Sequence, residues 1–126
     1  MIGRVWHGWT SRENADPYEA LLRTKILPGI RAVDGYRGAY ILRRDADEAV
    51  EFVTITLFDS LDAVRAFAGG DYEAAVVSPE ARALLSRFDE RALHYEIVVG
   101  PTVQTRRRRA PARGRPRAPR RPRGRR

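Results

Sequence analysis

The stretch Glu51–Gly69, EFVTITLFDSLDAVRAFAG, changes its hydrophobic period halfway along. Over residues 50–58 the side chains alternate between two faces, which is the period of a β-strand. After Asp59-Ser60, either of which can cap a helix, Leu61, Val64 and Phe67 recur at helical spacing. Gly69-Gly70 then ends the helix. This stretch predicts a strand that runs directly into a helix.

The sequence on either side extends this pattern to a complete domain. Further strands are predicted at residues 2–9, 36–43 and 92–99, with a polar hairpin connection at 44–48. A helix is expected to begin at an Asp16 cap, with Pro17 at its first position, and its regular part to end at Pro28-Gly29. Ile30 and Val33 suggest a short helical continuation before Asp34-Gly35. A third helix begins at Ser78-Pro79 and carries Leu85 and Phe88. The order β-α-β-β-α-α-β predicts an α+β, ferredoxin-like antiparallel sheet with helices on one face.

The predicted strands lack a clean polar side. Val53, Ile55 and Leu57 occupy one face of their strand, while the other face is half apolar and aromatic. Because the helices can cover only one face of the sheet, a second copy of the chain is the simplest cover for the other. We therefore expect a homodimer with the sheets face to face.

Composition divides the 126 residues into two parts. Residues 1–103 hold sixteen acidic and twelve basic residues, a net charge of −4, and are predicted to form the domain. Residues 104–126 are predicted to be a disordered tail, since 106–126 contain only Arg, Pro, Ala and Gly, with twelve arginines. This tail would bind nucleic acid or another polyanion non-specifically. Alternatively it is a passive extension, because G/C-only codons encode these four residues.

The sequence lacks the residues expected for disulfides, a metal site, a membrane span or a signal peptide. The chain has no cysteine and two histidines, so we expect neither disulfides nor a metal site built by the protein. No apolar run approaches the roughly 20 residues of a membrane span. The N-terminus lacks the features of a signal peptide. A cytoplasmic protein without membrane contact is the expectation.

Three stretches resemble the antibiotic biosynthesis monooxygenase (ABM) domain family of the dimeric α+β barrel superfamily. They are "RVWHGWT" at residues 4–10, "VDGYRG" at 33–38 and "EFVTITLFDSLDAVRAFAG" at 51–69. The resemblance covers about residues 1–99. It implies a ferredoxin-like protomer, a dimeric barrel, and a cavity between helices and sheet. Some members oxidise phenolic aromatics with O₂ and need no cofactor, so we expect no cofactor here.

Other members of that family degrade haem, and this sequence departs from their pattern. They carry Asn on the first strand, Trp near the end of the third and His on the following helix. Here the first strand has no Asn, Phe58 stands near the Trp position, and residues 60–68 contain no His. These departures argue against haem degradation.

His7 and His94 are the candidate catalytic bases, since they titrate nearest neutral pH. The first strand should pair antiparallel with the last, which would bring His7 and Trp9 near His94 and Glu96 if the alternation agrees. A structural role at the sheet rim or dimer seam is the alternative for both histidines. The candidate ligand-binding residues are Trp9, Phe58, Thr54, Thr56 and Glu96. Trp6 lies on the opposite face from Trp9, with Arg4 two residues before it, and Trp6 is expected to pack beneath the helices.

Three functional hypotheses follow. The first is a cofactor-independent monooxygenase acting on a small aromatic compound. The second is a non-catalytic ligand-binding or accessory dimer of the same fold. The third is polyanion binding through the arginine-rich tail.

Overall fold

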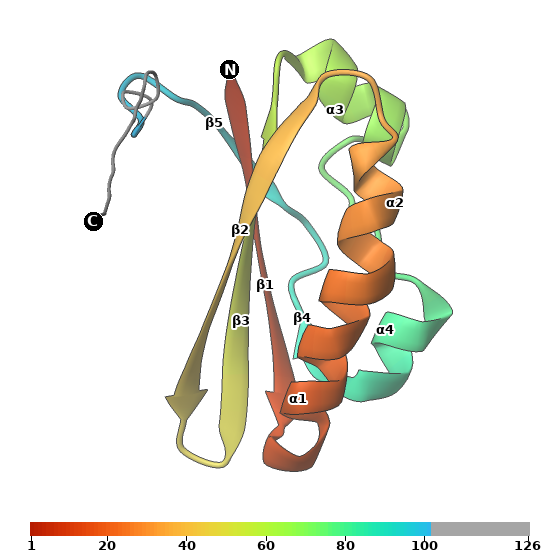
Figure 1. Cartoon of the computed structure of the whole chain (residues 1–126), viewed down its shortest axis with the longest axis vertical. Helices are drawn as coiled ribbons and strands as arrows, with labels where there is room; N and C mark the ends of the chain where they lie inside the picture. Colours follow the sequence, from red (N-terminus) through yellow and green to blue (C-terminus); the bar gives the residue numbers. More distant parts are fainter. Residues whose placement is uncertain (102–126) are drawn as a thin grey trace, which may run out of the picture. The chain divides into compact units, whose positions relative to one another are not determined.

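The structure is a computed structural model that describes residues 1–101. It contains one five-stranded sheet with the strand order β2-β3-β1-β4, in which β5 also pairs with β1 (Figure 1). β1 (Ile2–Ser11), β2 (Tyr36–Ala46) and β3 (Ala49–Phe58) are long antiparallel strands. β4 (Leu85–Phe88) and β5 (Leu93–Glu96) both pair with β1, along its second and first halves respectively. All these elements belong to the compact unit Met1–Glu96. The predicted tail, 104–126, lies outside the described residues.

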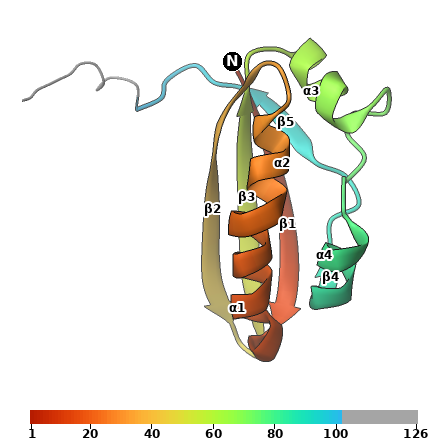
Figure 2. The same cartoon turned by 45° about the vertical axis from the view of Figure 1, so that its right-hand side comes forward.

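The helices cover one face of the sheet, as predicted (Figure 2). α1 (Arg12–Leu21), the π-helical turn η1 (Leu22–Ile26) and α2 (Leu27–Arg31) form one continuous helix along that face. α3 (Leu61–Ala68) follows β3, and α4 (Pro79–Leu84) precedes β4. The element order thus confirms the α+β, ferredoxin-like prediction. Within residues 1–101, no helix is long and apolar enough to cross a membrane.

The first helix begins earlier than predicted. Its cap is Ser11, whose Oγ accepts a hydrogen bond from the Asn14 backbone N–H at 3.2 Å. β1 continues to this residue, so the helix starts at Arg12 and Pro17 lies inside it. The predicted Asp16 cap was wrong because Ser11 satisfies the exposed N–H groups one turn sooner.

The same helix changes its geometry before Pro28 and continues past it, as the expected continuation through Ile30 implied. The Leu27 N–H reaches back five residues to the Leu22 carbonyl, which widens the turn directly ahead of Pro28. In a regular α-helix the proline ring would clash with the carbonyl four residues before it. The π turn replaces the α turn at that position, and the helix continues to Arg31.

The third predicted helix is shorter than expected. α4 ends at Leu84, and Leu85–Phe88 form strand β4 beside β1. There the Phe88 ring packs against Trp6, with ring centroids 5.8 Å apart. Tertiary pairing with β1 therefore overrides the helical spacing of Leu85 and Phe88.

The register assigns the residues of β1 and β3 to two faces. Phe52 and Phe58 are fully buried beneath the helices, each at the centre of one of two core clusters. The other face carries cross-strand rows of apolar residues, and no element of residues 1–96 covers it. Its most exposed large side chains are about half accessible: Tyr40 48%, Leu42 50%, Leu93 58% and Tyr95 54%.

Candidate functional site

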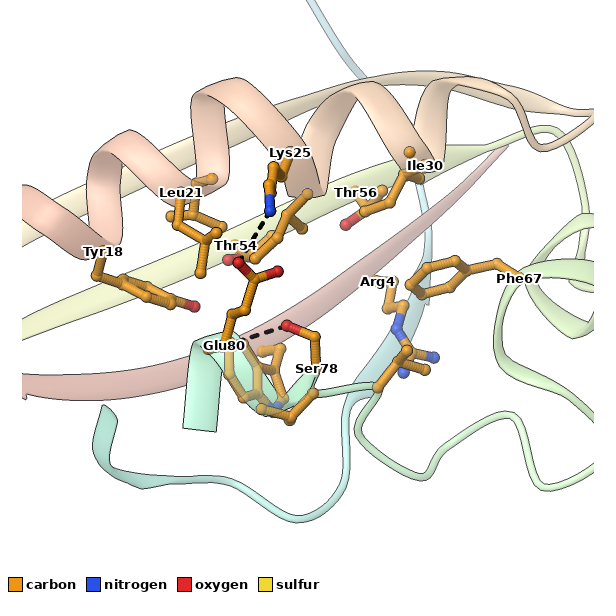
Figure 3. A pocket seen from close by; sticks show the side chains of 17 residues that line it. Arg4, Tyr18, Leu21, Lys25, Ile30, Thr54, Thr56, Phe67, Ser78 and Glu80 are labelled. Carbon is orange, nitrogen blue, oxygen red and sulfur yellow. Dashed lines mark hydrogen bonds and ion pairs between the residues drawn. The ribbon is translucent and has the colours of Figure 1, made fainter. Parts of the chain in front are cut away.

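A cavity of about 340 Å³ lies between the long helix and the sheet (Figure 3). Its floor comes from β1 and β3, where Trp6 pairs with Thr54 and Arg4 with Thr56. Because strand side chains alternate, these four residues share the helix-facing side of the sheet. The long helix, α3, the segment before α4 and the first turn of α4 complete the lining with Tyr18, Leu21, Leu22, Lys25, Ile26, Gly29, Ile30, Phe67, Val76, Val77, Ser78, Glu80 and Ala81.

Tyr18 closes one end of the cavity. Its side chain is 1% exposed, and its hydroxyl points inward along the cavity (Figure 3). Burial raises the pKa of Tyr18 to about 12, so the hydroxyl keeps its proton at neutral pH. Its ring packs edge-on against Phe52, with centroids 4.9 Å apart, which fixes the direction of the hydroxyl.

Arg4 and Phe67 form the other end (Figure 3). Arg4 is 4% exposed, and its guanidinium donates to the backbone carbonyls of Tyr72 and, at 2.9 Å, Ala74. The Arg4 Cζ lies 5.4 Å from the centroid of the Phe67 ring. Burial lowers the pKa of Arg4, yet an arginine stays charged in proteins. This end of the cavity is therefore positive and aromatic.

An ion pair connects the two sides of the cavity between these ends. Lys25 Nζ on the π turn lies 2.9 Å from Glu80 Oε2 on α4 (Figure 3). Both side chains are more than half exposed, so the pair lies at the solvent side of the lining. The π turn contributes Leu22 and Ile26 to the same wall, and such turns occur often at functional sites.

His7 and Trp9 lie on the opposite side of the sheet, away from this cavity. His7 Nδ1 is 3.2 Å from Asp89 Oδ2. The Arg87 guanidinium stacks over Trp9, 3.6 Å from the ring centroid. Their predicted roles in catalysis and ligand binding stay predictions, and on this geometry they would belong to the uncovered face.

The predicted pairing of His7 with His94 was wrong. β4 lies beside the second half of β1, so β5 reaches only the first half, where His94 pairs with Arg4. His94 consequently faces the helices, with its Nε2 3.0 Å from Arg4 Nη1. Burial and the nearby Arg4 charge lower the pKa of His94. Glu96 is exposed opposite Ile2, so it joins neither histidine.

Thr54 and Thr56 do line the cavity, as their position in a half-apolar stripe suggested. Phe58 is fully buried and stacks on Phe67, so it supports the lining from behind. Ligand binding by these three residues stays a prediction. Sequence reasoning missed Arg4, Tyr18 and Phe67 as lining residues. Of these three, only Arg4 could have been found from the sequence, because strand alternation places its charge on the same face of the sheet as Phe52 and Phe58.

No family model matches the sequence, and no curated protein sequence matches it. Solved structures do match the fold. Rv0793 from Mycobacterium tuberculosis has TM-score 0.54 and 20% identity, over 80% of this chain and 98% of that one. The haem-degrader MhuD from the same organism, with two haems bound in its active site, has TM-score 0.52 and 17% identity, over 79% and 98%.

A third match is a monooxygenase from the gene ActVA-Orf6 of Streptomyces coelicolor, in complex with the ligand Nanaomycin D. It has TM-score 0.50 and 15% identity, over 80% of this chain and 92% of that one. At these identities the likeness establishes the fold. The chain thus shares the α+β, ferredoxin-like fold of these solved structures, which is the fold that the resemblance of its sequence implied.

Proposed function

We propose that the cavity binds a small, planar, largely apolar molecule, and that the protein is a cofactor-independent monooxygenase of such aromatic compounds. The cavity itself carries the proposal. Its volume of about 340 Å³ is at the small end of ligand pockets, and aromatic rings line it beside a few polar groups. Two of the fold neighbours hold small molecules, MhuD two haems in its active site and the ActVA-Orf6 monooxygenase Nanaomycin D, which supports a small-molecule ligand for this fold.

The lining also suits oxygenation without a metal or flavin. Such chemistry needs a hydrophobic pocket for the ring and a group that takes or shares the phenolic proton. Trp6 and Phe67 supply aromatic walls, and Glu80 supplies a carboxylate at the solvent side. His94, whose lowered pKa favours the neutral imidazole, lies behind Arg4. We assign the proton transfer to Glu80 or His94 and none of it to His7.

Binding can be tested with the two tryptophans, because Trp6 lines the cavity and Trp9 faces the other side. In a Trp9→Phe variant, Trp6 is the only tryptophan, and a hydroxylated naphthoquinone should quench its emission saturably. In a Trp6→Phe variant the same titration should give only a weak, linear decrease. Saturable quenching of Trp9 instead of Trp6 would place the ligand on the uncovered face and overturn the proposal.

Catalysis needs a separate measurement, oxygen uptake with polycyclic phenols. Glu80→Gln and His94→Gln should each be compared with His7→Gln, which serves as the matched control. We expect substitution of the residue that acts as the base to lower the rate by roughly 100-fold or more, and His7→Gln to leave the rate unchanged. Saturable binding without any oxygen uptake would favour the non-catalytic ligand-binding or accessory protein.

We also propose that the uncovered sheet face is the seam of a homodimer. Three cross-strand rows support this, each apolar across most of the sheet. They consist of Leu42, Val53 and His7; of Tyr40, Ile55, Val5 and Leu93; and of Gly38, Leu57, Gly3 and Tyr95. Apolar patches this continuous usually mark an interface.

A further inference from the structure

Arg4 carries a buried charge that forms no ion pair with a carboxylate of residues 1–101. Seven other arginines of the described chain each lie within 4.0 Å of an Asp or Glu oxygen: Arg12, Arg23, Arg37, Arg43, Arg44, Arg65 and Arg91. Arg4 forms no such pair among residues 1–101, although it is 4% exposed. A buried charge without a counter-charge costs folding free energy, so its presence calls for an explanation.

The contacts that Arg4 makes do not use all its donors. Nη1 bears two N–H groups and meets the Tyr72 carbonyl and His94 Nε2. Nη2 bears two and meets the Ala74 carbonyl, while Nε makes no hydrogen bond within the described residues. The Nε–H and one Nη2–H therefore stay available. Two such donors are the pair that a carboxylate accepts side by side.

The surroundings fix the guanidinium but do not neutralise it. The carbonyls of Tyr72 and Ala74 hold it from the loop after α3, and the Phe67 ring lies against it. His94 cannot supply negative charge. Among the described residues that line the cavity, the charged groups besides Arg4 are Lys25 and Glu80, which pair with each other. The cavity thus has an uncompensated positive charge at its Phe67 end.

We propose that the cavity recognises an aromatic carboxylic acid, whose carboxylate binds Arg4 and whose rings extend from Phe67 past Trp6 toward Tyr18. This rests on the proposed ligand-binding function and names the class of ligand. The ligand anion supplies the missing counter-charge, and the apolar walls take the rings. The Tyr18 hydroxyl, protonated and aimed along the cavity, meets a polar group at the far end of a ligand long enough to reach it (Figure 3).

Two matched probes test this on the full chain: naphthoate, which is an anion, and naphthamide, its uncharged analogue of the same size. Binding is measured by calorimetric titration at physiological salt, because the salt screens the attraction between the anionic probe and the arginines of residues 106–126. We expect the wild-type protein to bind naphthoate at least about 10-fold more tightly than naphthamide. Because this comparison needs no mutation, it holds even if a variant fails to fold.

Substitutions then test whether Arg4 causes the preference for naphthoate over naphthamide. Arg4→Gln should weaken naphthoate binding by about 10-fold or more and leave naphthamide binding unchanged. Arg37→Gln is the control, since it removes an arginine that pairs with Asp59 outside the cavity lining, and should change the ratio by less than about 2-fold. Equal affinity of the wild type for both probes overturns the carboxylate proposal and leaves the ligand-binding function standing. Failure of the wild-type protein to bind either probe counts against both the carboxylate proposal and the ligand-binding function.

Discussion

Gly35, in the turn before β2, occupies a position that a side chain cannot share. Its φ is +89°, in the left-handed region, and a Cβ there would lie 2.5 Å from the Ala63 Cβ. Ala63 lies on α3, is 7% exposed and belongs to one of the two core clusters. The Gly35 carbonyl also accepts the Asp59 N–H at 2.8 Å, so the turn cannot easily move away. The glycine thus permits β2, β3 and α3 to meet.

Gly35→Ala should therefore destabilise the protein by about 2–4 kcal/mol, which combines backbone strain with overpacking. Gly69→Ala is the matched control, because Gly69 has φ +90° but nothing within 4 Å of the Cβ position. It should cost only the backbone strain of its φ of 90° and ψ of −173°, about 1–3 kcal/mol. Urea unfolding of both variants measures the difference, and equal losses would show that Ala63 imposes no steric limit.

His94 should make stability depend on pH near neutrality. Its pKa in the folded chain lies below the ordinary 6.5, first because of burial and then because of Arg4, with Glu73 acting weakly in the opposite direction. As the pH falls below 6.5, the unfolded chain binds a proton at this imidazole before the folded chain does. The free energy of unfolding therefore decreases with falling pH and levels off below the folded pKa.

Urea unfolding at intervals between about pH 7 and pH 5 checks this. The His94→Gln variant should show a smaller decrease across that window, because it lacks the titrating group. Identical slopes for the two proteins would refute the assignment of the pH dependence to His94.

At the scale of elements, serine caps determine where each helix begins. Ser11, Ser60 and Ser78 each accept a hydrogen bond from a backbone N–H three residues later, at 3.2 Å. The caps at Ser60 and Ser78 agree with their sequence patterns, Asp-Ser-Leu and Ser-Pro-Glu. At the first helix two patterns compete, and the end of β1 decides between them in favour of Ser11.

A pair of alanine substitutions separates the two start points of that helix. Ser11→Ala should lower the free energy of unfolding by about 1 kcal/mol, the usual value of an N-cap. Asp16→Ala should lower it by less than about 0.5 kcal/mol, since the Asp16 side chain is 91% exposed and forms only a surface pair with Arg43. A larger loss from Asp16→Ala than from Ser11→Ala would reinstate the cap expected from the sequence.

At the scale of the whole molecule, the sheet has one face covered by helices and one rich in apolar side chains. We expect a dimer in sedimentation at micromolar concentration. Leu42→Glu, at a half-exposed position on that face, should shift the protein toward the monomer, because it buries a charge at the seam. Ala20→Glu, at an exposed position on α1, should leave the mass unchanged. A monomeric wild-type protein would exclude this seam.

The local sequence pattern predicted most helices and strands. It did not predict that β4 and β5 pair with different halves of β1. The strand-to-helix corner at Asp59-Ser60 and the alternation in β3 depend on adjacent residues, so the sequence predicts them directly. The short strand β4 depends on contact of Phe88 with Gly8 and Trp6, residues that lie eighty or more positions earlier in the chain. No local period signals that contact, and the position of His94 follows from it.

The sequence by itself determined the α+β order of elements, the helix-covered face and the alternation that separates Trp6 from Trp9, because these arise from near-neighbour geometry. Only the tertiary structure decided that His94 meets Arg4 instead of His7, because the register of β5 depends on where β4 pairs with β1. It also decided that Arg4, Tyr18 and Phe67 line one cavity, since they come from three elements that only packing brings together.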